Sequence, residues 1–231
     1  TSSLVGSEMC IRDRIKLTMV LYGGESMSRE ILKLVQKIDS STVDLQMVLQ
    51  CAPVLAGLKV SNMLSVSRAF YPRILEVLKE TDISCYLLRQ TDEKVILLLY
   101  KEQELQQQLL EADTRAFLKS YGYTQFAVED VLDLFKKRYC DNLCTTKDFP
   151  HEMGVLLGYP LEDVKGFINN RGRNFLYTGY WKVYSDLQQK VDLFGCFEQA
   201  KEQMIRLLSY GMDIQEIIMM FHYEELREAV I

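Results

Sequence analysis

Segment 148–184 brings together the residue types that could do chemistry. It contains His151, one of only two histidines in the chain, directly followed by Glu152. A histidine titrates near neutral pH, and beside a carboxylate it could act as a general acid or base. Adjacent residues on a helix point about 100° apart, however, so the two side chains need not share a target. The alternative is structural, with Glu152 complementing the dipole at a helix N-terminus.

Cysteine could add a nucleophile or a metal ligand to this pair. Cys140 and Cys144 lie four residues apart on one face of a predicted helix, and His151 follows Cys144 by seven residues. A Cys144 thiolate with His151 as its base is one possible arrangement. A metal site would need further ligands from His222 or Cys196, and nothing in the sequence places them nearby. We therefore favour a buried structural pair of thiols, predict no metal site and identify no cofactor.

A second set of residues could bind an anionic or aromatic ligand, or a partner protein. In "GYWKVY", Tyr180, Lys182 and Tyr184 alternate on one face of a predicted strand, with Trp181 and Val183 on the other. The single tryptophan is expected in the core. The basic residues grouped with the Tyr-Lys-Tyr face are Lys59, Lys165, Arg171 and Arg173. The alternative is a solvated strand face, and the sequence around Lys59 lacks the spacing of a phosphate-binding loop.

The run "EMGVLLGYPLEDVKGFI" also has the rhythm of a helix-turn-helix through 150–170. A recognition helix presents basic and amide side chains to the DNA groove, whereas Glu162 and Asp163 in its first turn would repel phosphate. The net charge of −5 also argues against nucleic acid as the main partner. An ordinary pair of helices is the better interpretation.

The elements that must position these residues follow from apolar periodicity and from turn residues. Helices are predicted over 28–38 with Ser28 as N-cap, 43–49, 71–81, 102–122 with a break, 127–140, 187–210 and 213–221. Two short helices are predicted after 148, the first capped by Asp148 and ended by Gly158, the second started by Pro160. Residues 51–67 are predicted to be extended chain with a turn, because Pro53 and Gly57 break the helical pattern.

Two apolar runs over 83–100, separated by "RQTDE", predict a β-hairpin, and a further strand is predicted near 176–184. The second run of the hairpin is apolar on both faces, which is typical of a central, covered strand. Few strands dispersed among many helices predict an α+β fold: a helix-rich single domain around a small mixed or antiparallel sheet.

Length and composition are ordinary for one globular domain: 231 residues, 48% hydrophobic and 26% charged. No apolar run approaches the roughly 20 residues that span a bilayer, so no membrane association is expected. The six cysteines contain no C-x-x-C pair and no signal peptide is evident, which favours reduced thiols and a cytoplasmic location.

The first residues have the character of a leader rather than of folded protein. Residues 1–14, "TSSLVGSEMCIRDR", resemble a translated sequencing-adapter artefact, and "GGE" at 23–25 can be encoded by a ribosome-binding sequence just before Met27. We therefore expect residues 1–26 to be adapter and untranslated leader, and 27–231 to form a single globular α+β domain. The alternative is a genuine N-terminal strand in "IKLTMVLYGG".

Three motifs, "CAPVLAGLK", "DFPHEMGVLLGYPLEDVKGFI" and "GYWKVY", resemble a family of anaerobic Gram-positive bacteria, domain of unknown function 3793, over about residues 27–231. The resemblance implies a bacterial, intracellular, single-domain protein and supplies no activity or catalytic residues. We predict an accessory protein that binds a small molecule or a protein through segment 148–184. The alternatives are an enzyme that uses His151 and Glu152, with or without Cys144, and more distantly a DNA-binding helix-turn-helix.

Overall fold

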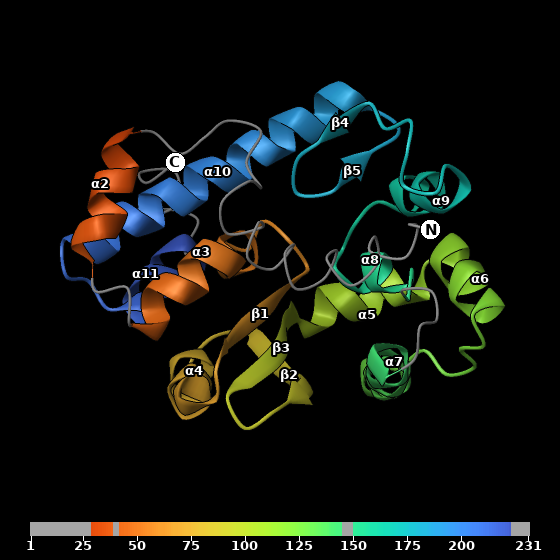
Figure 1. Ribbon diagram of the computed structural model, residues 1–231, viewed down its shortest axis with the longest axis horizontal. Coiled ribbons are helices and arrows are strands. Elements are labelled where there is room, and N and C mark those ends of the chain that lie inside the picture. Colours follow the sequence, from red (N-terminus) through yellow and green to blue (C-terminus); the bar gives the residue numbers. More distant parts are fainter. Residues whose placement is uncertain (1–28, 39–41, 145–149, 223–231) are drawn as a thin grey trace, which may run out of the picture.

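A three-stranded antiparallel sheet lies between two layers of helices in the computed structural model, which describes residues 29–38, 42–144 and 150–222 (Figure 1). The strands follow the order β1-β3-β2, with bounds β1 (Ser61–Ser67), β2 (Ile83–Gln90) and β3 (Lys94–Lys101). Strands β2 and β3 form the predicted hairpin. Its connection is shorter than predicted, because Arg89 and Gln90 still pair with Ile96 and Val95 beyond a bulge.

Strand β3 is covered on both faces, as its unbroken apolar sequence predicts. Val95, Leu97 and Leu99 point into one hydrophobic core, and Leu98 and Tyr100 point into another. Successive side chains along a strand face opposite sides of the sheet, so a single strand contributes to both cores.

Five helices pack against the first face of the sheet and against one another. Their bounds are α2 (Arg29–Lys37), α3 (Val43–Leu55), α4 (Tyr71–Leu78), α10 (Leu187–Ser209) and α11 (Ile214–His222). A short 3-10 helix, η1 (Arg68–Phe70), joins β1 to α4. The predicted stop at Gly211 is confirmed by its φ of 85°. The predicted cap at Asp213 is confirmed by a 2.8 Å hydrogen bond from the Gln215 backbone N–H to its Oδ1.

Helix α3 is longer than predicted, because Pro53 lies inside it instead of ending the helical pattern. The prediction of a helix over 43–49 alone was wrong. Residues 51–56 are all buried, and we infer that their apolar contacts outweigh the hydrogen bond that a proline removes from a helix. The helix ends at Leu55 and is followed by Gly57 in a left-handed conformation (φ 67°), and the Leu58 backbone N–H donates to the Pro53 carbonyl oxygen over 2.9 Å.

The second face of the sheet is covered by helices from the middle of the chain. Their bounds are α5 (Glu102–Leu110), α6 (Ala112–Ser120), α7 (Val128–Cys144) and α8 (Met153–Leu156). The break predicted within 102–122 falls at Glu111. Gly158 (φ 68°) ends α8, and Pro160 precedes α9 (Leu161–Asn169), as predicted.

The predicted strand near 176–184 is divided into a small hairpin of β4 (Tyr177–Thr178) and β5 (Lys182–Val183). The turn begins at Gly179, which lies so close to Phe194 of α10 that an added Cβ would be 2.3 Å from its ring. Trp181, Val183, Phe194 and Phe197 form a third apolar cluster between this hairpin and α10. Trp181 is therefore in a core, as predicted.

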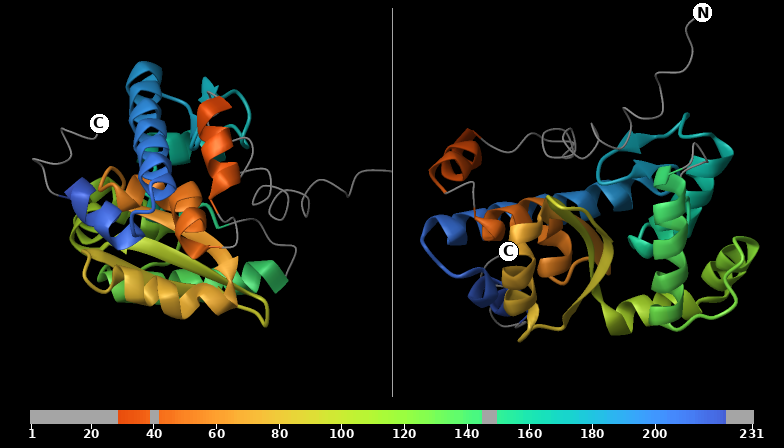
Figure 2. Two further views of the ribbon diagram at one scale, coloured as in Figure 1. Left: turned by 90° about the vertical axis from the view of Figure 1, so that its left-hand side faces the viewer. Right: turned by 60° about the horizontal axis from the view of Figure 1, so that its bottom comes forward.

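Figure 2 shows this hairpin and α9 at one end of α10, beside the sheet and its helices. The fold is a helix-rich α+β domain with small antiparallel sheets, as predicted. Among the described helices, none combines the length and the apolar character that crossing a membrane requires. The leader predicted over 1–26 and the caps predicted at Ser28 and Asp148 lie outside the described residues.

Candidate functional site

His151 and Glu152 face two different environments. The Glu152 side chain is fully buried, and its Oε1 lies 2.6 Å from Nε of Arg138 on α7. The His151 ring is half-buried and lies 5.9 Å from the ring of Phe167 on α9, measured between centroids. The structure therefore does not bring these two side chains together as an acid and a base on one target.

Arg138 is the cation that compensates the buried charge of the Glu152 carboxylate. The Tyr123 hydroxyl donates to Glu152 Oε1 over 3.4 Å, and burial together with the Glu152 charge raises the pKa of that hydroxyl, so it remains a donor. Oε2 of Glu152 has no hydrogen-bond partner within the described part of the chain. The Arg138 side chain is 35% exposed and donates from Nη1 to the Tyr121 carbonyl oxygen over 2.7 Å. This arrangement is a buried ion pair that joins α7 to the start of α8.

The thiols and the second histidine are distributed over separate elements. Cys140 is half-buried and its Sγ lies 3.7 Å from the Leu88 carbonyl oxygen, whereas Cys196 is exposed. The side chain of Cys144 lies outside the described residues. His222 Nδ1 lies 2.9 Å from Asp82 Oδ1. Within the described ranges, no group of three or more His, Cys, Asp or Glu side chains is arranged to hold a metal ion.

Lys59 is buried in the connection between α3 and β1, with 8% of its surface exposed. Its amine donates to the Ser61 carbonyl oxygen over 2.8 Å and lies 5.1 Å from the centre of the Tyr159 ring. No carboxylate among the described residues forms an ion pair with it. Burial lowers the pKa of the Lys59 amine from its usual 10.5 to about 7. The amine faces a backbone oxygen and an aromatic ring.

Tyr180 belongs to the third apolar cluster and not to a shared Tyr-Lys-Tyr face. Its ring packs edge-on against Phe197 with 5.0 Å between centroids, and its hydroxyl donates to Glu198 Oε1 over 2.8 Å. Burial, followed by the Glu198 carboxylate, raises the pKa of Tyr180. The turn after Gly179 separates β4 from β5, which removes the strand alternation on which the shared face was predicted.

Helix α9 and the β4–β5 hairpin pack together and are called here the α9–hairpin unit (residues 161–184). Asp163 is 2% exposed and accepts hydrogen bonds from Trp181 Nε1 and from the Tyr184 backbone N–H, both over 2.7 Å. Gly166 allows Tyr184 to lie directly on the helix, since an added Cβ would be 2.5 Å from the ring. Asp163 therefore points inward and holds the unit together.

Loop 170–176 of this unit is held in an uncommon backbone conformation. Arg171 and Asn174 have φ values of 51° and 54°, and Gly172 has a φ of 70°. A left-handed conformation costs a non-glycine residue roughly 1–2 kcal/mol, and such residues concentrate at functional sites. The amine of Lys182 donates to the Gly172 carbonyl oxygen over 2.7 Å, which ties the loop to the hairpin.

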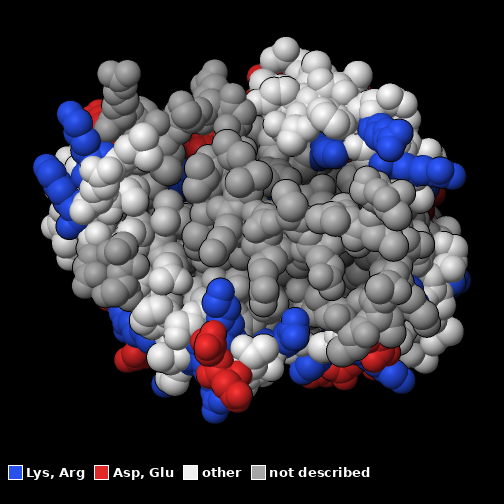
Figure 3. All heavy atoms as spheres, viewed as in Figure 1, with Lys and Arg blue, Asp and Glu red and all other residues white. Residues whose placement is uncertain are grey.

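The unit presents a mixed surface, the basic-apolar face, formed by Lys165, Arg171, Arg173, Phe175 and Leu176, all of which are exposed. Phe175 is 43% exposed and Leu176 is 58% exposed. No ion pair within the described residues involves the three basic side chains. Figure 3 shows Lys and Arg side chains gathered over the region of α9 and the hairpin, at the upper right.

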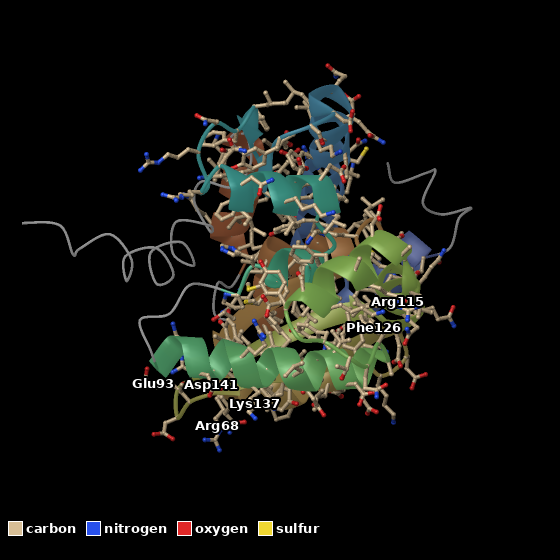
Figure 4. The ribbon with its side chains drawn as sticks, turned by 90° about the vertical axis from the view of Figure 1, so that its right-hand side faces the viewer. Arg68, Glu93, Arg115, Phe126, Lys137 and Asp141 are labelled. Atoms are coloured by element: carbon tan, nitrogen blue, oxygen red, sulfur yellow. The ribbon has the colours of Figure 1, made fainter. Side chains whose placement is uncertain are left out.

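A hollow elsewhere on the molecule contains none of the predicted site residues. Its volume is about 450 Å³, and it is lined by Ser67, Arg68, Ala69, Pro72, Asp92 and Glu93. In Figure 4, Arg68 lies below α7 and Glu93 beside its left end, whereas the α9–hairpin unit lies above it. The hollow is shallow and holds no buried polar side chain, so the basic-apolar face is the better candidate for recognition.

Sequence reasoning missed Phe175 and Leu176, which were assigned to the start of a strand. A signal was present: the run "NNRGRN" predicts a turn directly before these two large apolar residues. Arg138 gave no such signal, because its partner Glu152 is brought near only by tertiary packing.

We expect Gly166→Ala to weaken the docking of the hairpin on α9. The new methyl group would overlap the Tyr184 ring, and overpacking of this kind costs about 1–3 kcal/mol of unfolding free energy. Chemical denaturation measures the loss. Gly195→Ala on α10 is the matched control, because its Cβ would meet nothing within 4 Å and should leave stability unchanged or increased. Equal stability of the two variants would contradict the tight contact at Gly166.

Fold and surface together define a helix-rich α+β domain that carries an exposed basic and apolar surface on its α9–hairpin unit. The family model described as protein of unknown function (DUF3793) matches residues 47–218, from within α3 to within α11, and the chain belongs to this family. The resemblance found in the sequence is thereby confirmed. No curated protein and no solved structure matches the chain.

Proposed function

We propose that the protein is an accessory protein that binds a ligand or partner through the basic-apolar face of the α9–hairpin unit. The observation that carries this proposal is the exposure of Phe175 and Leu176 beside Arg171 and Arg173 on a fixed loop. Arginine and large apolar side chains are typical anchors of binding surfaces.

The constraint on the loop supports recognition, because a surface held in one conformation loses little entropy on binding. Besides the Lys182 contact, the Gly172 backbone N–H donates to the Phe167 carbonyl oxygen over 2.8 Å. The Asn170 side chain donates to the Gly166 carbonyl oxygen over 2.9 Å. The four described cysteines are free thiols, which supports action in a reducing compartment such as the cytoplasm.

Hydrogen exchange in the presence of defined probes tests this proposal. The probes are an acidic peptide that contains apolar residues, an oligonucleotide and heparin. We expect at least one probe to slow exchange in loop 170–176 of the wild-type chain, and not in the double variant Phe175→Ser/Leu176→Ser. Protection of this loop by none of the probes would overturn the proposal.

A further inference from the structure

We propose that the basic-apolar face binds an acidic protein segment that carries an exposed aliphatic or aromatic side chain. This inference rests on the proposed function and specifies the partner. The juxtaposition behind it is an apolar pair, Phe175 and Leu176, on the same short loop as two guanidinium groups, Arg171 and Arg173, that pair with no carboxylate of the described chain.

The charge of the unit favours an acidic partner. Residues 161–184 contain four basic and two acidic side chains, although the whole chain has a net charge of −5. Both acidic side chains are already engaged. Glu162 Oε1 lies 2.9 Å from the Lys190 amine, and this contact lowers the pKa of Glu162 against the effect of burial. Asp163 is buried beneath Trp181. Lys165, Arg171 and Arg173, which form no ion pair within the described residues, are therefore left for a partner. Arginine binds carboxylate in a bidentate manner.

The apolar pair favours a protein segment over nucleic acid. Binding of single-stranded nucleic acid relies on bases that stack on free aromatic faces. The Lys182 amine lies 4.8 Å from the centre of the Phe175 ring and covers one of its faces. Leu176, the more exposed of the pair, offers no face on which a base could stack. An aliphatic side chain between cations instead matches a protein surface that has an apolar centre and a charged rim.

The experiment measures fluorescence anisotropy of three labelled probes with the full chain. The first probe is a short peptide of Asp, Glu and Ser around a central Leu-Phe pair, and the second replaces that pair with Ser-Ser. The third is an oligonucleotide of matched charge. The variants are Arg171→Asn/Arg173→Gln, in which asparagine tolerates the positive φ at 171, and Phe175→Ser/Leu176→Ser. The control is Lys79→Gln/Lys119→Gln, two exposed lysines on other elements.

We expect the wild-type chain and the control to bind the Leu-Phe peptide, and each test variant to bind it at least about tenfold more weakly. Thermal unfolding of each variant confirms that it is folded. Equal affinity for the Ser-Ser peptide would overturn the role of the apolar pair. Tighter binding of the oligonucleotide would overturn the choice of a protein partner and leave the proposed function standing. Binding of no probe would overturn both.

Discussion

Lys59→Met is expected to stabilise the protein at neutral pH. The amine is buried without a carboxylate partner in the described part of the chain, and burial lowers its pKa from 10.5 to about 7. At about 1.4 kcal/mol for each pKa unit, this shift costs the folded state on the order of 3–5 kcal/mol at pH 7. Methionine is a long, unbranched side chain like lysine but carries no charge, so it removes that cost. It also loses the contact with the Ser61 carbonyl oxygen, so we expect a net gain of about 2–4 kcal/mol in denaturant unfolding.

The pH dependence of this effect has a definite sign. Between about pH 7 and pH 10.5 the unfolded chain holds a proton on Lys59 that the folded chain has lost. The free energy of unfolding of the wild type should therefore rise with pH across this window through Lys59, and the gain from methionine should shrink to near zero at its upper end. Lys119→Met, at an exposed lysine, should change neither the stability nor its slope. A Lys59→Met chain less stable than the wild type at pH 7 would refute the argument.

Arg138→Met is expected to produce the largest loss of stability among single substitutions at the predicted site residues and their partners. Within the described residues, it leaves the fully buried Glu152 carboxylate with the Tyr123 hydroxyl at 3.4 Å as its one remaining partner. Removing one partner of a buried ion pair costs about 3–5 kcal/mol, and methionine retains the apolar stem, so the loss reports charge and not packing. Urea denaturation measures the difference.

The reverse substitution, Glu152→Gln, should cost less, because the partly exposed Arg138 guanidinium can be solvated. The double variant Arg138→Met/Glu152→Gln should recover much of the loss, which a double-mutant cycle quantifies. Arg206→Met at the exposed pair with Glu30 is the control and should have little effect. If Arg138→Met cost no more than this control, Glu152 would not depend on Arg138.

Local patterns in the sequence predicted most of the elements. The hairpin, the covered strand β3 and helix α10 each have a periodicity that their own residues determine, and Gly158, Pro160 and Gly211 have conformational requirements visible in a single chain. The prediction that Pro53 ends the helix was wrong, because the burial of the surrounding residues is a tertiary effect that outweighs local propensity.

The site was less predictable than the fold. Arg171 and Arg173 lie on an exposed loop, as charged residues usually do. The predicted Tyr-Lys-Tyr face required an unbroken strand, and the turn at Gly179 interrupts that strand. The opposite directions of His151 and Glu152 are set by which neighbour each meets, Phe167 or Arg138, and both neighbours are distant in sequence.

Strand β3 contributes side chains to two cores, and this limits how the chain can be divided into folded fragments. Its alternate side chains pack into both helical layers, so a fragment that kept one layer would expose a row of large apolar side chains to water on the other side of the same strand. No cut through the sheet yields a self-sufficient half. The helices of both layers are thus packed against the same central strand.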